Sequence, residues 1–203
     1  MKRIITVILS LAASLVVMAQ VRITTPETEL IIKADKGADL QILYFGARLS
    51  DADAANIEAA GVSGHSAYRA YGLWCASEAS LGVTHADGNL STSLKVESVM
   101  QSDVIDNSIV TKVVMKDAVY PFYVTVCYRA YQDVDMIETW TEIANLGKKP
   151  VTLTRFDSGY LPVRVGDVWL SHLHGTWAAE GLLVQEPLQR GMKVIKNKDG
   201  SRN

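Results

Sequence analysis

The chain has 203 residues and a formal net charge of −2 at pH 7, with 48% hydrophobic and 21% charged residues. A chain of this length and composition can bury a sizeable hydrophobic core. This net charge gives no basic footprint, so we expect no nucleic-acid partner.

The N-terminus has the pattern of a secretory signal peptide. Two positive charges precede an apolar run from Ile4 to Met18, and Val17 and Ala19 fit the small-residue cleavage pattern of a signal peptide. The run is shorter than the roughly 20 residues that span a membrane. We therefore expect residues 1–19 to be a signal peptide and residues 20–203 to form one domain, exported to the periplasm or the extracellular space. The alternative is an uncleaved N-terminal anchor.

Most of the remaining sequence has the pattern of β-strands. The run from Tyr120 to Tyr131 is rich in aromatic and β-branched residues, which favour strands. Within it, Phe122, Val124, Val126 and Tyr128 recur at every second position and would line one face. Further strands are expected at residues 30–34, 40–45, 90–100, 109–115, 136–143, 151–156 and 168–173.

The segments between these strands contain turn residues. Asp, Asn and Gly cluster at residues 87–89, 106–108, 145–147 and 165–167. Strands separated by such turns, without recurring amphipathic helices, favour an all-β antiparallel sandwich.

One segment departs from the β pattern. Residues 50–61 begin with the capping residue Ser50, continue with two Asp in an Ala-rich stretch, and end at Gly61. This order predicts one short surface helix within a long connection. Long loops in β-sandwiches often carry function, but a simple insertion explains this one equally well.

Cys75 and Cys127 are the only cysteines in the chain. An exported protein could join them in a disulfide. Cys127 lies in an apolar strand, where a buried free thiol is an equally good interpretation. Both interpretations stay open.

The segment 168–181 contains two of the four Trp and two of the four His residues. His172 and His174 would face the same side of a strand, but a zinc or copper site needs at least one further ligand, and none stands at a diagnostic spacing. We expect structural, hydrogen-bonded histidines, and no metal or other cofactor.

Two tryptophans are candidates for carbohydrate contact. Trp177 follows Gly175, which favours display from a loop, where a flat ring can stack on a sugar. The alternative is a Trp that fills the core. Trp74, two residues after Gly72, has the same two interpretations.

A glycosidase would require a pair of carboxylates as acid and nucleophile. The chemically suitable residues are Asp157, Glu138, Glu142 and Glu180, and nothing in their spacing brings two of them together. We interpret most of them as solvated residues at strand edges or turns. No catalytic residue is therefore predicted in this chain.

The C-terminal residues add one more predicted strand. Residues 194–196 have a strand pattern, and a polar turn at 197–203 follows with no strand to complete a hairpin. A frayed tail is one interpretation, and a chain that ends inside its domain is the other.

Several segments, in order, resemble the N-terminal β-domain of the family 36 glycoside hydrolases, the melibiase-type α-galactosidases. They cover nearly all of the chain after the apolar leader, and the last contains the pattern His-Leu-x-Gly-x-Trp-x-x-Glu. The matching segments are residues 46–49, 68–72, 85–89, 120–122 with the strand that follows, 134–142, 157–159 and 172–180.

This resemblance implies an antiparallel β-supersandwich, incomplete here, that precedes a catalytic (β/α)₈ barrel. Family members hydrolyse terminal α-linked galactose with retention, and both catalytic Asp residues lie in the barrel, one in a Lys-Trp-Asp motif. Neither motif occurs in this chain. The resemblance also implies a homo-oligomer in the full-length protein, in which loops of this domain narrow a neighbouring galactose pocket.

Two functions follow as hypotheses. In the first, the chain is a non-catalytic accessory domain of an exported α-galactosidase, with an exposed apolar face for the barrel. Its candidate barrel-interface or substrate-binding residues are Trp177, Glu180, His172, His174 and Trp74. In the second, the chain is a stand-alone carbohydrate-binding or adhesion module with a sugar-sized groove.

Overall fold

The structure is a computed structural model that describes residues 20–61, 63–72, 78–163, 166–189 and 191–196. Within these residues the chain is all-β with one short α-helix, as the sequence predicts. It divides into two compact units between Pro162 and Val163. The predicted signal peptide, residues 1–19, lies outside the described residues. In the described part, no helix is both long and apolar enough to cross a membrane.

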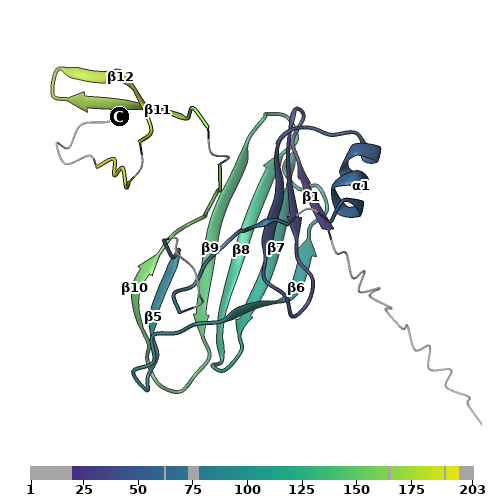
Figure 1. Cartoon of the computed structure of the whole chain (residues 1–203), viewed down its shortest axis with the longest axis vertical. Helices are drawn as coiled ribbons and strands as arrows, with labels where there is room; N and C mark the ends of the chain where they lie inside the picture. The colour runs from purple at the N-terminus through teal and green to yellow at the C-terminus, as the bar shows by residue number, and fades with distance from the viewer. Residues whose placement is uncertain (1–19, 62, 73–77, 164–165, 190, 197–203) are drawn as a thin grey trace, which may run out of the picture. The chain divides into compact units, whose positions relative to one another are not determined.

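The first unit contains two four-stranded antiparallel sheets (Figure 1). The first sheet has the order β1 (Gln20–Thr24), β2 (Thr28–Lys33), β3 (Gln41–Ala47) and β4 (His65–Ser66). The second sheet has the order β6 (Leu94–Gln101), β7 (Ser108–Asp117), β8 (Phe122–Tyr131) and β9 (Ile137–Asn145). A separate antiparallel pair joins β5 (Leu81–Thr84) to β10 (Thr152–Phe156).

The core lies between the two four-stranded sheets. Phe122, Val124, Val126 and Tyr128 of β8 are at most 5% exposed, so the alternation in the sequence does mark the buried face. They share one apolar cluster with inward-facing residues of the first sheet, among them Ile23 and others from β2 and β3. Burial of these side chains from both sheets supplies the main stabilisation of the unit.

The turn before β7 follows the predicted chemistry. Asp106 and Asn107 have φ values of 49° and 54°, and Ile105 pairs with Ser108 across them. Two successive residues with positive φ fit the right-handed twist of the strands, and Asp and Asn tolerate this backbone better than most residues.

The predicted helix is α1 (Asp51–Ala59), which lies beside β1 (Figure 1). The Asp53 amide donates to Ser50 Oγ at 3.2 Å, so Ser50 is the cap that the sequence indicates. Gly61, just beyond the helix, has a φ of 60°, which suits a glycine terminator. Ala54 is buried and fixes the inner face of the helix.

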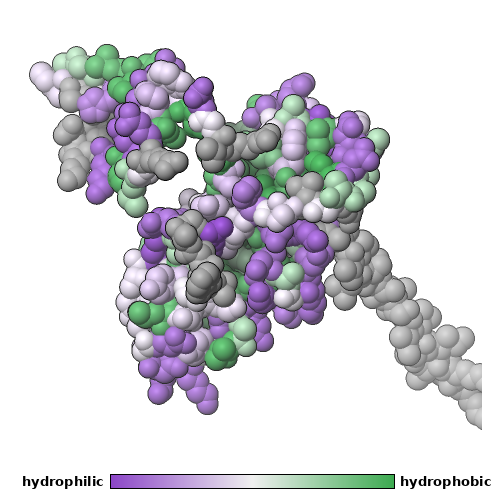
Figure 2. All heavy atoms as spheres, in the orientation of Figure 1, coloured by the Kyte–Doolittle hydropathy of each residue, from purple (hydrophilic) through white to green (hydrophobic). Residues whose placement is uncertain are grey.

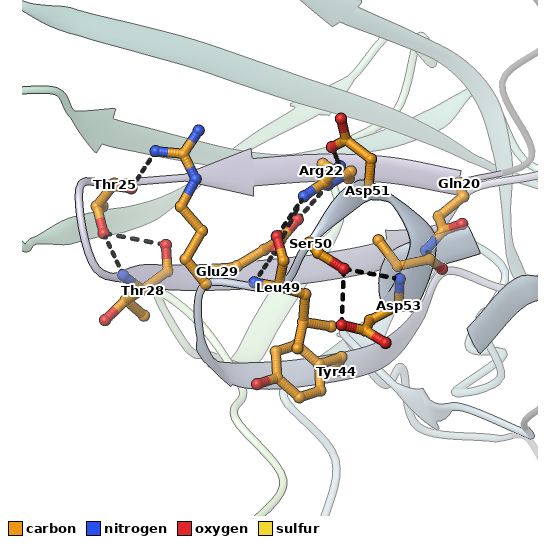
Figure 3. A network of polar contacts seen from close by, with 12 residues as sticks. Gln20, Arg22, Thr25, Thr28, Glu29, Tyr44, Leu49, Ser50, Asp51 and Asp53 are labelled. Atoms are coloured by element: carbon orange, nitrogen blue, oxygen red, sulfur yellow. Dashed lines mark hydrogen bonds and ion pairs between the residues drawn. The ribbon is translucent and has the colours of Figure 1, made fainter. Parts of the chain in front are cut away.

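A charged network holds the start of α1 against β1 and β2 (Figure 3). The Glu29 carboxylate is fully buried, and it accepts hydrogen bonds from the Arg22 guanidinium and, at 3.0 Å, from the Leu49 amide. Arg22 Nη1 also donates to Asp51 at 2.6 Å. Hydrogen bonds from Arg22 to Glu29 and Asp51 raise the pKa of Arg22 further above its usual value. A buried carboxylate needs such partners, and here they connect three segments.

The second unit contains one antiparallel hairpin, β11 (Trp169–Thr176) with β12 (Ala179–Pro187). The predicted strand at 168–173 is therefore correct but too short. The strand predicted at residues 194–196 is wrong, since Val194 and Ile195 are about half exposed and pair with no strand among the described residues. The polar turn predicted after it lies outside the described residues.

One strand begins later than predicted, and several strands were not predicted at all. β6 begins at Leu94 rather than at Leu90, because Asn89 Oδ1 accepts from the Ser91 amide at 3.0 Å and extends the turn. The strands β1, β4, β5 and β12 were not expected. β5 has only four residues, and β12 contains Gly181 with a φ of 73°, which weakens any strand pattern.

Candidate functional site

The β11–β12 hairpin carries four of the five residues that the sequence singles out. Its register pairs Trp169 with Pro187, His172 with Val184, and Leu173 with Leu183. Because side chains alternate across a strand, Trp169 and Leu173 share one side of the hairpin, and His172 and His174 share the other. The prediction that both histidines face the same side is correct.

The tip of the hairpin displays Trp177, whose residue surface is 88% exposed. The next residue, Ala178, has a φ of 63°, so the strand reverses direction within two residues. Glu180 lies at the same tip and is also exposed. In the described structure Trp177 is therefore displayed on a turn and does not fill a core, which leaves its indole faces open to a ligand or another surface.

One side of the hairpin is apolar and exposed. We call the surface of Trp169, Leu173 and Leu183 the Trp169 face; these residues are 62%, 47% and 63% exposed. Figure 2 shows apolar residues gathered on the surface of this unit. The sequence analysis did not select Trp169, although its alternation with Leu173 in a strand was a usable signal.

The opposite side of the hairpin is partly covered and carries an ion-paired group beside Leu170, Leu182 and Val184. His172 Nε2 lies 3.7 Å from Glu186 Oε1, and Lys193 Nζ lies 2.7 Å from the same oxygen. The Lys193 ammonium, and to a smaller degree His172, lower the pKa of Glu186. The prediction of a hydrogen-bonded structural histidine fits His172, whose Nδ1 is also 3.3 Å from the Leu173 carbonyl.

Among the described residues no group of three or more His, Cys, Asp or Glu side chains could hold a metal ion. His174 is exposed on the hairpin. Trp74 and Cys75 lie outside the described residues.

Cys127 is a free, buried cysteine, and its Sγ lies 3.6 Å from Glu142 Oε1. Burial, with a smaller contribution from Glu142, raises the pKa of the Cys127 thiol to about 11.

The other candidate carboxylates lie in the first unit, and each has a basic partner. Glu138 accepts from Arg129 at 3.0 Å, and Glu142 accepts from Lys112 at 2.7 Å. Asp157 accepts from Arg155 at 3.2 Å. Each of these three carboxylates is thus engaged in an ion pair within the first unit.

Comparisons with known proteins place the chain in a family. The model of the "Glycosyl hydrolase family 36 N-terminal domain" matches residues 38–203. No curated protein sequence matches the chain.

Solved structures show the same fold. An α-galactosidase from Lactobacillus brevis matches with a TM-score of 0.73 at 19% identity, covering 86% of this chain. The family 36 α-galactosidase AgaA from Geobacillus stearothermophilus matches with a TM-score of 0.73 at 18% identity, covering 85% of this chain. The galactosidase domain of an α-galactosidase–sucrose kinase matches with a TM-score of 0.72 at 19% identity, also covering 85%.

In each of these three comparisons the chain spans 28% of the length of the solved protein. The family match covers well over half of this chain, and it agrees with the segments that carry the resemblance in the sequence. The all-β fold and its single helix agree with the same assignment. The chain belongs to the N-terminal domain family of the family 36 glycoside hydrolases.

Proposed function

We propose that the chain is the non-catalytic N-terminal accessory domain of an exported α-galactosidase that acts on terminal α-linked galactose. The membership in the N-terminal domain family supports the accessory role. The solved proteins of the same fold are α-galactosidases, and one form of the Geobacillus enzyme was solved with raffinose. The apolar leader from Ile4 to Met18 supports export.

The observation that carries this proposal is the exposed apolar surface of the hairpin. Trp169 and Leu183 are both more than 60% exposed, and Trp177 is 88% exposed. A two-stranded hairpin is marginally stable by itself, and exposed apolar clusters are typical of contact surfaces. In the proposal this surface packs on a catalytic (β/α)₈ barrel of the same or a companion chain, and Trp177 lies at the entrance to the galactose pocket. Oligomers of the full-length protein would bring the same hairpin to a neighbouring subunit.

The carboxylates support a non-catalytic role. Glu138, Glu142 and Asp157 are each paired with a basic side chain, and Glu180 lies at the tip of the hairpin. Hydrogen bonding to Lys112 is the main cause that lowers the pKa of Glu142. An acid catalyst at neutral pH needs the opposite shift.

The first test measures hydrolysis of p-nitrophenyl α-D-galactopyranoside. The purified chain is compared with a form extended beyond Asn203 by the coding sequence that follows. We expect turnover only in the extended form. Activity that co-purifies with the short chain would overturn the proposal, and Asp157→Asn and Glu180→Gln would then be the first variants to examine.

The second test asks whether the hairpin shapes the pocket entrance. In the active extended form, Trp177→Ala should raise KM by about tenfold, because a lost aromatic contact of this kind is worth roughly 1–2 kcal/mol. The control is Leu146→Ala, which removes a side chain of similar exposure, 69%, from a turn of the first unit. Equal kinetics for the two variants would exclude a role for Trp177 at the entrance.

The alternative is a stand-alone carbohydrate-binding module, favoured by the open indole of Trp177. In this case the chain alone binds galactosides through Trp177, and the extended form is no more active than the short one. Affinity electrophoresis of the chain and of Trp177→Ala in galactomannan gels separates the two functions.

A further inference from the structure

A pocket of about 440 Å³ lies within the first unit and is lined by none of the hairpin residues that the proposed function uses. Its walls come from both four-stranded sheets, with Leu30 and Phe45 on one side and Tyr128 and Thr139 on the other. The segment 158–161 forms a third wall. This volume falls within the range of roughly 300–1,000 Å³ that is typical of small-molecule sites. We call it the inter-sheet pocket.

The first sign of a ligand is the Tyr128 hydroxyl. Tyr128 is only 5% exposed, and in the described part of the chain no group hydrogen-bonds its hydroxyl. Burial raises the pKa of Tyr128 further above its usual value, so the hydroxyl stays protonated and can donate. The hydroxyl is not one of the fully enclosed, unpaired polar atoms of the described residues, so it opens on the pocket that Tyr128 lines. A polar ligand in the inter-sheet pocket would give this hydroxyl its partner.

The second sign is the Asp135 carboxylate, which lines the same pocket. Thr25 Oγ1 donates to Asp135 Oδ1, and Thr28 Oγ1 donates to Oδ2 at 2.8 Å. These two hydroxyl donors, Thr25 first, lower the pKa of Asp135. The backbone amides of Glu27 and Thr28 also donate to this carboxylate, so it is charged and held in one orientation on the wall of the pocket.

The pocket also offers an apolar surface and further hydroxyls. The Phe45 ring is 48% exposed and contributes to the wall, as does Tyr160. Thr139 and Ser158 add hydroxyl groups. Flat aromatic surface, a fixed carboxylate and several hydroxyls match the chemistry of a pyranose, which has an apolar ring face and a rim of groups that both donate and accept.

We propose that the inter-sheet pocket binds one hexose unit of a neutral sugar, with Asp135 and Tyr128 contacting sugar hydroxyls and Phe45 contacting the ring face. The single carboxylate disfavours anionic sugars by charge repulsion. The pocket lies in a domain to which no catalysis is assigned, so this is a second sugar site that does not depend on the barrel. It would hold a carbohydrate chain near the enzyme without cleaving it.

The test titrates the full 203-residue chain with methyl α-D-galactopyranoside, and saturation-transfer NMR measures binding. We expect weak, saturable binding with a Kd on the order of 1 mM. Tyr128→Phe should weaken it about fivefold to tenfold, the usual contribution of one neutral hydrogen bond. Asp135→Asn should weaken it at least tenfold, because hydrogen bonds to a charged group are stronger. Tyr128→Phe should leave Tm unchanged or raise it, since the hydroxyl has no protein partner among the described residues.

The matched control is Tyr131→Phe. Tyr131 lies three residues further along β8, and its hydroxyl donates to Glu138 at 3.1 Å on the outer face of the sheet. The same atom is removed from the same strand, but outside the pocket, so binding should not change. Trp177→Ala serves as a second control, because it removes the candidate sugar contact of the hairpin.

Three results would overturn the inference. The first is no binding at sugar concentrations on the order of 10 mM, well above the expected Kd. The second is binding that Trp177→Ala abolishes and Tyr128→Phe leaves intact, which places the sugar on the hairpin. The third is tight binding of tetramethylammonium in place of the sugar, which would assign the carboxylate and rings to a cation. None of these results bears on hydrolysis by the extended form, so the two proposals fail separately.

Discussion

The β-sandwich of the first unit and the β11–β12 hairpin are built from the same kind of strand but differ in what covers them. In the sandwich, Phe122 and Val124 are completely buried because a second sheet lies over them. In the hairpin, Trp169 and Leu173 lie on one side of β11 in the same way and are 62% and 47% exposed. The alternation of apolar and polar residues along a strand thus determines which face is apolar, but a second layer of structure is needed to bury that face. We therefore expect the sandwich to be more stable than the hairpin in the isolated chain.

The largest expected effect contrasts the two regions directly. Phe122→Ala should lower the free energy of unfolding by about 3–5 kcal/mol, the usual cost of a cavity left by a buried aromatic ring. Trp177→Ala should change it by less than about 0.5 kcal/mol in the isolated chain, because its side chain is exposed. Urea denaturation followed by circular dichroism measures both. Similar losses for the two variants would contradict the contrast.

The next effect concerns the Arg22–Glu29–Asp51 network within the sandwich. Glu29→Ala should cost about 2–3 kcal/mol, because it removes charged hydrogen bonds of a buried carboxylate and leaves Arg22 and the Leu49 amide without it. Asp51→Ala is the control, since its side chain is 99% exposed and a surface ion pair is worth about 0–1 kcal/mol. Chemical denaturation compares them. A smaller loss for Glu29→Ala than for Asp51→Ala would refute this ranking.

Hydrogen exchange sharpens the comparison without any mutation. Amides of β7 and β8 pair on both sides within the second sheet and should exchange only with global unfolding. Amides of β11 and β12 lie in a two-stranded hairpin and should exchange through local opening at a free energy near zero. Exchange with mass-spectrometric peptide mapping measures this. In the extended form the hairpin should gain protection, and unchanged exchange there would argue against barrel contact.

The smallest effect is the pH dependence around Cys127. Its thiol has a pKa raised from 9.0 to about 11, mainly by burial. Above pH 9 the unfolded chain loses the thiol proton before the folded chain does, so the stability contribution is present below pH 9 and falls as pH rises toward 11. In a Cys75→Ser variant, alkylation of Cys127 by iodoacetamide at pH 8 should be far slower in buffer than in urea. Equal alkylation rates in buffer and in urea would mean that the Cys127 thiol is accessible in the folded chain and that its pKa is not raised.

Sequence patterns predicted the sandwich well because they depend on local rules. The period of two in residues 122–128 and the cap and terminator of α1 need only neighbouring residues. The strand predicted at residues 194–196 failed for the same reason, since a strand pattern does not supply a pairing partner. β5 and β12 escaped prediction because one is short and the other contains a glycine with positive φ.

The candidate site was predictable in part. The sequence located the hairpin segment, and the structure brings Trp177 and Glu180 together at its tip with the two histidines on one side. It did not indicate Trp169 or the pairing of His172 with Glu186, which requires the hairpin register. The inter-sheet pocket was not visible at all, because Thr28 and Asp135 are 107 residues apart in the chain.

The sequence by itself determined the strand character, the one helix and the family, since these rest on composition, on short-range periodicity and on ordered motifs. The tertiary structure decided which apolar residues are buried, which carboxylates have partners, and that Tyr128 and Asp135 line one pocket. Local patterns are set within a few residues along the chain, whereas burial and pockets depend on which distant strands face each other.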